Sequence, residues 1–123
     1  MIRSESVPFT TTAGGAATVY SSAFRGYVHA IRYVWADGDT GLDATITDDA
    51  SGLPILTITN AGVASTNHYP RAATVGITNA ALVYAGTDAV TDRIPVTSKV
   101  KFVIAQGGNV KTGSFIVFWD DAR

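Results

Sequence analysis

The sequence contains no cysteine. This absence excludes disulfide bonds, thiolate metal ligands and cysteine nucleophiles, so stability must come from packing, within the chain or against neighbouring subunits. No run of about 18 apolar residues is present, so no membrane span is predicted. The first six residues lack the apolar segment of a secretory signal. We therefore expect synthesis and folding in the cytoplasm of the cell that makes it.

Charged residues are also scarce. They make up 15% of the 123 residues, against a usual share of roughly 25%. Lys and Arg number 9 and Asp and Glu number 10, which gives a net charge of −1. No clustered basic face is predicted, so we expect no nucleic-acid partner. With so few charges, we expect a surface made mainly of Thr, Ser, Asn, Gly and Ala. Such a surface is either fully exposed to solvent or partly covered by other subunits in an assembly.

Two apolar runs near the C-terminus give strong strand patterns in the sequence. Val100, Phe102 and Ile104 alternate with two lysines and a valine, which predicts a half-buried strand. Residues 115–119 are apolar at every position, so we expect one face of this strand to be covered by a second sheet and the other by a further layer or another subunit. The turn residues 107–109 between the runs are typical of a hairpin.

The N-terminal residues predict a second hairpin. Residues 2–9 alternate weakly and include Pro8, which suits an edge strand because proline cannot donate to a ladder. Residues 17–24 resume a strand pattern after a glycine turn. The length predicts a single domain, with residues 1–25 as an N-terminal strand or arm segment and residues 26–123 as the body. Such an arm either stays on its own body or docks on a neighbour.

The middle of the chain also follows strand periodicity. Residues 42–47 alternate, with Leu42, Ala44 and Ile46 predicted to face inward. Residues 81–84 predict a further short extended piece, and no window shows a helical apolar stripe. About eight short strands at such spacings predict an all-β antiparallel sandwich. The strongest pattern is in residues 26–36, which predict a central strand with Tyr27, His29, Ile31, Tyr33 and Trp35 on one face.

One acidic loop could suit a cation. Asp37, Asp39 and Asp43 lie around two glycines, an arrangement with some likeness to an oxygen-ligand calcium loop. The loop lacks the distal glutamate of an EF-hand, and Asp-Gly is a common turn sequence, so turn formation is favoured and calcium binding stays open. Asp48 and Asp49 are interpreted as solvated turn charges.

No catalytic, cofactor or metal site is predicted. His29 and His68 are the only histidines, and neither lies in a ligand-spaced motif. We expect a partly buried imidazole for His29 and a surface loop position for His68. No serine lies in a Gly-x-Ser-x-Gly elbow, and residues 106–109 are followed by a strand rather than by the helix that a phosphate loop needs. The tyrosines and tryptophans could form a sugar-stacking platform, but aromatic residues in strands are more often core or interface anchors.

Four segments together resemble a known family: residues 51–60, 69–72, 94–96 and 103–113. They are similar to small structural proteins encoded among the virion genes of tailed bacteriophages, over most of the chain from about Tyr27 onward. The resemblance implies a jelly-roll-like β-sandwich without enzymatic activity. It further implies a capsid decoration (cement) protein on the surface of the virion, or else a head–tail, neck or tail component.

For a decoration protein the expected partners are the major capsid protein and copies of the chain itself, as a homo-oligomer, with no nucleic acid and no membrane. Multivalent contacts of modest strength would bind and stabilise the capsid exterior. A carbohydrate- or receptor-binding module is a third possibility. The candidate contact residues are four of the N-terminal segment and two aromatic residues expected to be exposed: Ile2, Arg3, Val7, Phe9, Tyr69 and Trp119.

Overall fold

The computed structural model describes residues 2–73, 83–84, 88–89 and 91–121. Every regular element in this part of the chain is a β-strand, and it contains no helix long and apolar enough to cross a membrane. The strands are β1 (Ile2–Thr10), β2 (Ala17–Tyr20), β3 (Gly26–Trp35), β4 (Asp43–Asp48), β5 (Pro54–Ile58), β6 (Thr66–His68), β7 (Ala72–Ala73), β8 (Val83–Tyr84), β9 (Asp88–Ala89), β10 (Thr91–Asp92), β11 (Ile94–Val96), β12 (Val100–Ala105) and β13 (Thr112–Asp121).

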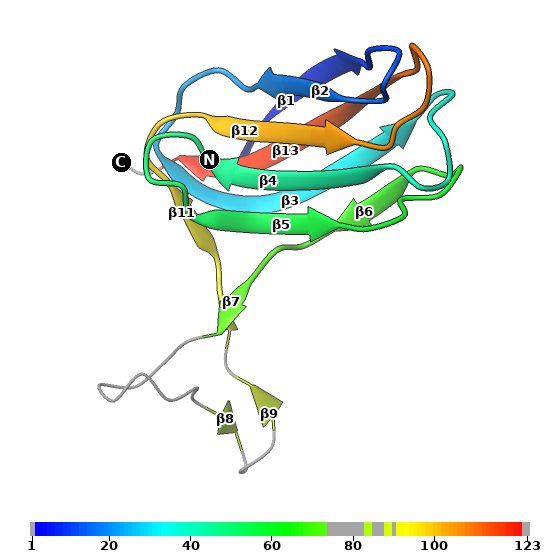
Figure 1. The fold of residues 1–123 in the computed structure, drawn as a ribbon. Helices are drawn as coiled ribbons and strands as arrows, with labels where there is room; N and C mark the ends of the chain where they lie inside the picture. Colours follow the sequence, from blue (N-terminus) through cyan, green and yellow to red (C-terminus); the bar gives the residue numbers. More distant parts are fainter. Residues whose placement is uncertain (1, 74–82, 85–87, 90, 122–123) are drawn as a thin grey trace.

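Two antiparallel sheets face each other (Figure 1). Sheet A has the order β1-β13-β3-β11, with β6 also paired to β3, and sheet B has the order β2-β12-β4-β5. The pairing is nested, because β1 pairs with β13, β2 with β12, β3 with β6 and β11, and β4 with β5. A long antiparallel ribbon wrapped in this way is a jelly roll. The predicted all-β sandwich is therefore confirmed.

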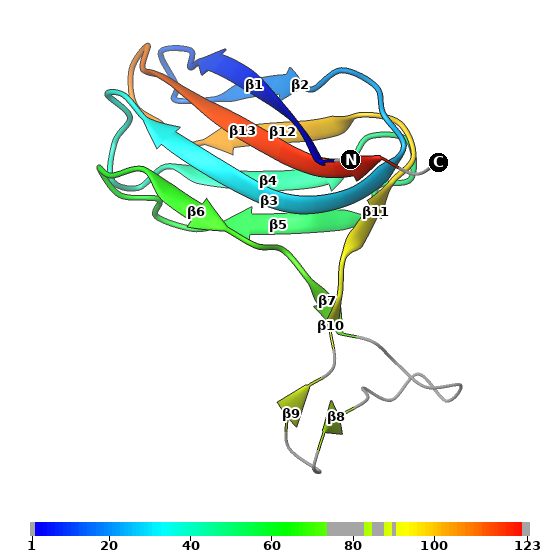
Figure 2. The same ribbon diagram turned by 180° about the vertical axis from the view of Figure 1, so that it is seen from behind.

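Four short strands lie outside the two sheets. β7 pairs with β10 and β8 pairs with β9, between β6 and β11 in the chain. Figures 1 and 2 show both pairs projecting from one edge of the sandwich. Of the predicted extended piece at residues 81–84, Val83 and Tyr84 form β8, while residues 81 and 82 lie outside the described residues.

Both predicted hairpins are wrong. β12 and β13 belong to opposite sheets, as do β1 and β2. The turn between β12 and β13 contains three residues with positive φ, Gln106 (56°), Gly108 (96°) and Val110 (51°), and it carries the chain from sheet B to sheet A. Turn residues of this kind suit a hairpin and a crossover equally well, and the partner of each strand is fixed by contacts distant in sequence.

The N-terminal strand lies along the body of the molecule. β1 is the edge strand of sheet A, as the proline predicted, and it pairs with β13 from Ile2 opposite Asp120 to Thr10 opposite Thr112. The Thr11 N–H donates to the Lys111 carbonyl (2.8 Å) as this ladder continues. Even-numbered residues of β1 therefore direct their backbone groups to the open edge, where the missing N–H of Pro8 leaves no gap in the ladder.

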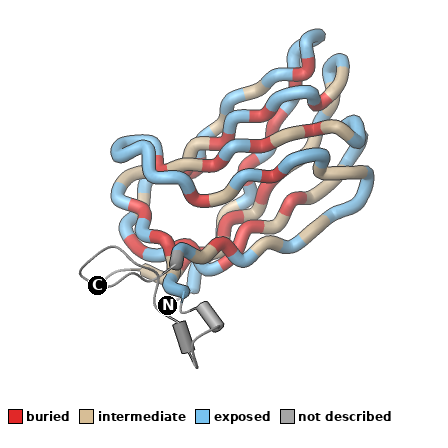
Figure 3. The backbone as a smooth tube through the Cα atoms, turned by 60° about the horizontal axis from the view of Figure 1, so that its bottom comes forward, coloured by how far each residue is buried: buried red, intermediate tan, exposed pale blue. Residues whose placement is uncertain are grey.

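The core lies between the two sheets. The predicted inward residues Leu42, Ala44 and Ile46 are fully buried, and so are those of β12. Figure 3 shows buried positions alternating with exposed ones along the strands.

A β-bulge changes the pattern in β3. Phe118 pairs with Ala30 and Trp119 with Val28, so one extra residue, His29, is accommodated between them. Beyond the bulge, Ile31 and Tyr33 share one face as predicted, and that face is the buried one. Before it the phase is reversed, so Tyr27 and His29 are exposed, contrary to the prediction, and Val28 is buried.

Candidate functional site

The six candidate contact residues have different environments. Ile2 and Tyr69 are exposed, by 52% and 62%. Arg3 forms an ion pair with Asp121 through its Nε. Val7, Phe9 and Trp119 are in the core, where they cannot contact a partner. The expectation fails for Val7 and Phe9 because these alternate residues of β1 face sheet B.

Trp119 was expected to be exposed, and it is buried. Phe24, from the connection between β2 and β3, stacks on its indole with ring centroids 4.3 Å apart. The indole Nε1–H donates to Asp121 (3.0 Å). The ring therefore has both an apolar cover and a hydrogen-bond acceptor within its own chain, and no partner is needed to satisfy it.

The outer face of sheet A is poor in charge. Ile116 and Phe118 in β13 point outward and are only half-buried. In the neighbouring strand β1, Ser4 pairs with Phe118 and Ser6 with Ile116. Figure 2 looks onto this face, and no further layer of strands covers it in the part of the chain that the structure describes. Sheet B covers the inner face of β13, as expected. That a further layer or another subunit covers the outer face stays a prediction.

A hollow of about 270 Å³ opens on the same face. Phe118 contributes to its lining from β13, and Tyr69 contributes from the end of β6. Arg32 and Asn67 line it as a pair, because the Arg32 Nη1–H donates to the Asn67 Oδ1 (2.6 Å). His29, the extra residue of the bulge, is the remaining polar side chain of the lining. An apolar surface with a few convergent polar groups is the usual make-up of a small-molecule site.

A second guanidinium fixes the backbone beside this hollow. The Arg71 Nη1–H donates to the carbonyl oxygen of His29 (3.0 Å) and to that of Pro70 (2.7 Å). These bonds tie the segment after β6 to the bulged part of β3. No carboxylate of the described residues forms a salt bridge with Arg32 or Arg71.

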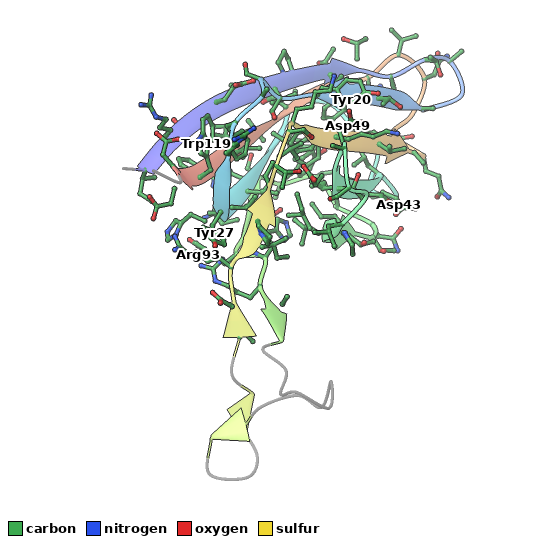
Figure 4. The ribbon with its side chains drawn as sticks, turned by 90° about the vertical axis from the view of Figure 1, so that its left-hand side faces the viewer. Tyr20, Tyr27, Asp43, Asp49, Arg93 and Trp119 are labelled. Atoms are coloured by element: carbon green, nitrogen blue, oxygen red, sulfur yellow. The ribbon has the colours of Figure 1, made fainter. Side chains whose placement is uncertain are left out.

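Two other exposed aromatic residues are already engaged by cations. The Arg93 guanidinium lies 5.0 Å from the centre of the Tyr27 ring, and the Lys99 ammonium lies 4.4 Å from that of Tyr20. Arg93 also forms an ion pair with Asp120 (2.9 Å), and this hydrogen bond lowers the pKa of the Asp120 carboxyl. Figure 4 shows Tyr27 and Arg93 side by side next to β11. These contacts stabilise the chain itself and leave Tyr69 as the more available ring.

Asp48 was interpreted as a solvated turn charge, and it is fully buried. Its carboxylate accepts hydrogen bonds from the hydroxyls of Ser51 (2.5 Å), Thr97 (2.9 Å) and Ser98 (3.2 Å). Burial alone would raise the pKa of Asp48, but the hydrogen bonds from Ser51 and Thr97 lower it to about 2. The interpretation fails because these donors replace water, so the carboxylate joins the turn after β4 to the connection before β12.

The acidic loop has a structural use as well. Asp37 accepts hydrogen bonds from the Thr112 N–H (2.6 Å) and hydroxyl (3.2 Å), and the bond from the backbone lowers its pKa. Asp43 accepts one from the Asn60 N–H (2.9 Å). No group of three His, Cys, Asp or Glu side chains could hold a metal ion within residues 2–73 and 91–121.

The two histidines also differ from expectation. His29 is exposed rather than partly buried, because of the bulge. His68 lies within β6 rather than in a loop, and its Nε2 forms a hydrogen bond with the Thr66 hydroxyl (2.9 Å). Burial lowers the pKa of the His68 imidazole. Sequence reasoning missed the pair of Arg32 and Asn67, whose members are 35 residues apart and meet only through the pairing of β3 with β6.

Comparison with known proteins adds little. No protein-family model matches the chain, and the search of curated proteins finds no match. Among solved structures, the chain is similar to one described as "Crystal Structure of FLHE", with 11% identity, a TM-score of 0.46 and 96% of each chain covered. Similarity at this level carries no argument about function.

Proposed function

We propose that this chain is a non-enzymatic structural subunit of a tailed-bacteriophage particle, bound to the outside of the capsid as a decoration protein. The observation that carries the proposal is the outer face of sheet A, where Ile116 and Phe118 are half-buried and lie beside the serines of β1. A sheet face with few charges on a rigid sandwich is suited to adhesion over an area. The resemblance of the sequence to virion structural proteins supports the same assignment.

Two carboxylates that are hydrogen-bonded within the chain support a structural role. Asp48 and Asp37 both accept hydrogen bonds that hold connections between strands in place. Each of these carboxylates is occupied by donors of its own chain, so neither is available as a general base. The proposed partners are the major capsid protein and further copies of this chain, with each copy bridging neighbouring capsid subunits. Contacts that are individually weak then add up over many copies.

The test is binding to particles from which the protein has been stripped. We expect Ile116→Lys to reduce rebinding, because it places an ammonium group on the face that is proposed to be covered. The matched control is Thr45→Lys, which adds the same charge at an exposed position of sheet B. Pelleting of particles with each purified variant measures binding, and circular dichroism confirms that both variants are folded.

Heating the particles then measures stabilisation. Particles that carry the wild-type protein should retain DNA to a higher temperature than stripped particles. Equal rebinding of Ile116→Lys and Thr45→Lys would refute the assignment of the face, and equal DNA retention with and without the protein would refute the stabilising role. Cryo-electron microscopy tests the placement, since density confined to the neck or tail would favour a head–tail, neck or tail component instead.

A further inference from the structure

The hollow on the outer face of sheet A is bordered by an exposed aromatic ring, that of Tyr69. Tyr69 is 62% exposed, more than the exposed tyrosines Tyr20 and Tyr27. Those two rings each lie against a cation, whereas Tyr69 has no ring or cation contact with the described residues. A side chain so exposed contributes little to folding, yet its ring borders the hollow together with Phe118. An aromatic ring in this position can pack against the flat, apolar face of a ligand.

The polar part of the lining is cationic and is held in place. One N–H of the Arg32 guanidinium is used by Asn67, which leaves further donors of the same planar group unassigned. The lining contains no carboxylate. A guanidinium without an acid partner favours a carboxylate ligand, because the two planar groups can form paired hydrogen bonds.

The backbone around the hollow is also fixed. The bulge at His29 places an imidazole at the rim, and Arg71 binds the carbonyl oxygen of the same residue. Bulges often redirect a side chain next to a binding site. The polar groups of the rim therefore come from two paired strands, β3 and β6, and do not depend on a free loop.

From this geometry we propose that the hollow binds an acidic saccharide, a pyranose ring that bears a carboxylate. One C–H face of the sugar packs on Tyr69, and the carboxylate pairs with Arg32. Asn67 and His29 are the partners for ring hydroxyls. The volume of about 270 Å³ lies at the small end of ligand sites, which suits one sugar ring rather than a peptide segment. The hollow shares Phe118 with the face proposed to attach to the capsid, so this binding activity belongs to the free subunit.

The experiment is an NMR titration of the full chain with glucuronic acid and, in parallel, with glucose, which differs in lacking the carboxylate. We expect saturable shifts of β3 and β6 amides with a Kd of about 1 mM for glucuronic acid, and binding of glucose at least about tenfold weaker. Tyr69→Ala should weaken glucuronic acid binding at least about tenfold. The matched control Tyr20→Ala, which removes an exposed ring from sheet B, should bind as the wild type does.

Arg32→Gln separates charge from shape. It should bring the affinities for glucuronic acid and glucose together, while Arg32→Lys should keep part of the preference. The absence of saturable shifts, equal binding of both sugars by the wild type, or unchanged binding by Tyr69→Ala would each overturn the proposal. Sedimentation adds a further check, because a wild-type dimer that Tyr69→Ala converts to a monomer would mean that a second copy occupies the hollow. None of these outcomes changes the capsid test, which depends on Ile116.

Discussion

Phe102 and Phe115 stack across the interior of the sandwich, with ring centroids 5.0 Å apart and an angle of 22° between the rings. They belong to β12 and β13, which the turn between them places in opposite sheets. Phe115 also lies against Phe9 (5.7 Å) and Tyr33 (5.3 Å). This one ring therefore joins sheet B to three strands of sheet A, and its contacts hold the two layers together.

Truncation of this ring should be among the most destabilising single changes. Phe115 is fully buried, so we expect Phe115→Ala to lower the free energy of unfolding by about 3–5 kcal/mol. Urea unfolding followed by tryptophan fluorescence measures the change. The control is Val103→Ala on the exposed face of sheet B, which should cost less than about 1 kcal/mol. A small loss for Phe115→Ala would mean that the sheets pack differently.

Asp48 should make stability fall in acid. Its pKa is about 2 in the folded chain against an ordinary 3.8, so folding favours the ionised form. The stabilisation is fully present above the ordinary pKa, and it is lost as the pH falls from about 5 through 2. We expect a loss of about 2 kcal/mol over this range. Asp48→Asn should remove that part of the pH dependence, as measured by urea midpoints at successive pH values. If Asp48→Asn lost stability in acid as steeply as the wild type, the loss would have to come from other carboxyl groups.

Tyr33 has a buried hydroxyl that is unsatisfied within the described residues. The side chain is fully buried, and its hydroxyl has no hydrogen-bond partner among the described residues. Burial raises the pKa of this hydroxyl. Because an unsatisfied buried hydroxyl costs free energy, Tyr33→Phe should leave stability unchanged or raise it by up to about 1–2 kcal/mol. Thermal and urea unfolding both test this expectation, and a clear loss of stability would reveal a partner such as a bound water.

Two glycines with positive φ provide a matched pair. Gly15 (φ 83°) packs so that an added Cβ would lie 3.0 Å from the backbone nitrogens of Gly107 and Gly108. Gly52 (φ 74°) has open space around the same position. Both alanine variants incur the cost of the left-handed conformation, about 1 kcal/mol, but only Gly15→Ala also forces two connections apart. We expect Gly15→Ala to be the more destabilising in urea, and equal losses would contradict the close approach.

The periodicity of the sequence predicts the inner face of most strands. Leu42 and Phe102 are buried as their alternation indicates, and Pro8 correctly marks an edge strand. Alternation fails where the bulge at His29 shifts its phase, and again in β5, where the register with β4 shifts and Ile55 and Ile58 are the buried residues. No local pattern signals a bulge. Pairing could not be predicted either, because β1 finds its partner at the other end of the described chain.

The polar features were harder to predict than the core. Asp48 has the sequence context of an ordinary turn, and its donors Thr97 and Ser98 are 49 and 50 residues away. Likewise, the cover on Trp119 comes from Phe24, and the lining of the hollow comes from three strands. Such sites form from the topology, so a residue's type and spacing reveal its capacity for hydrogen bonding but not its partners.

The position of β13 has a consequence for biosynthesis. β13 is the neighbour of both β1 and β3, so sheet A has no continuous ladder until residues 112–121 have emerged from the ribosome. Earlier segments of the nascent polypeptide must wait with their apolar faces unpaired, and a fold so rich in distant pairings forms slowly. Sheet A should therefore fold only once β13 has emerged, and until then chaperones that bind exposed strands have the best opportunity to act.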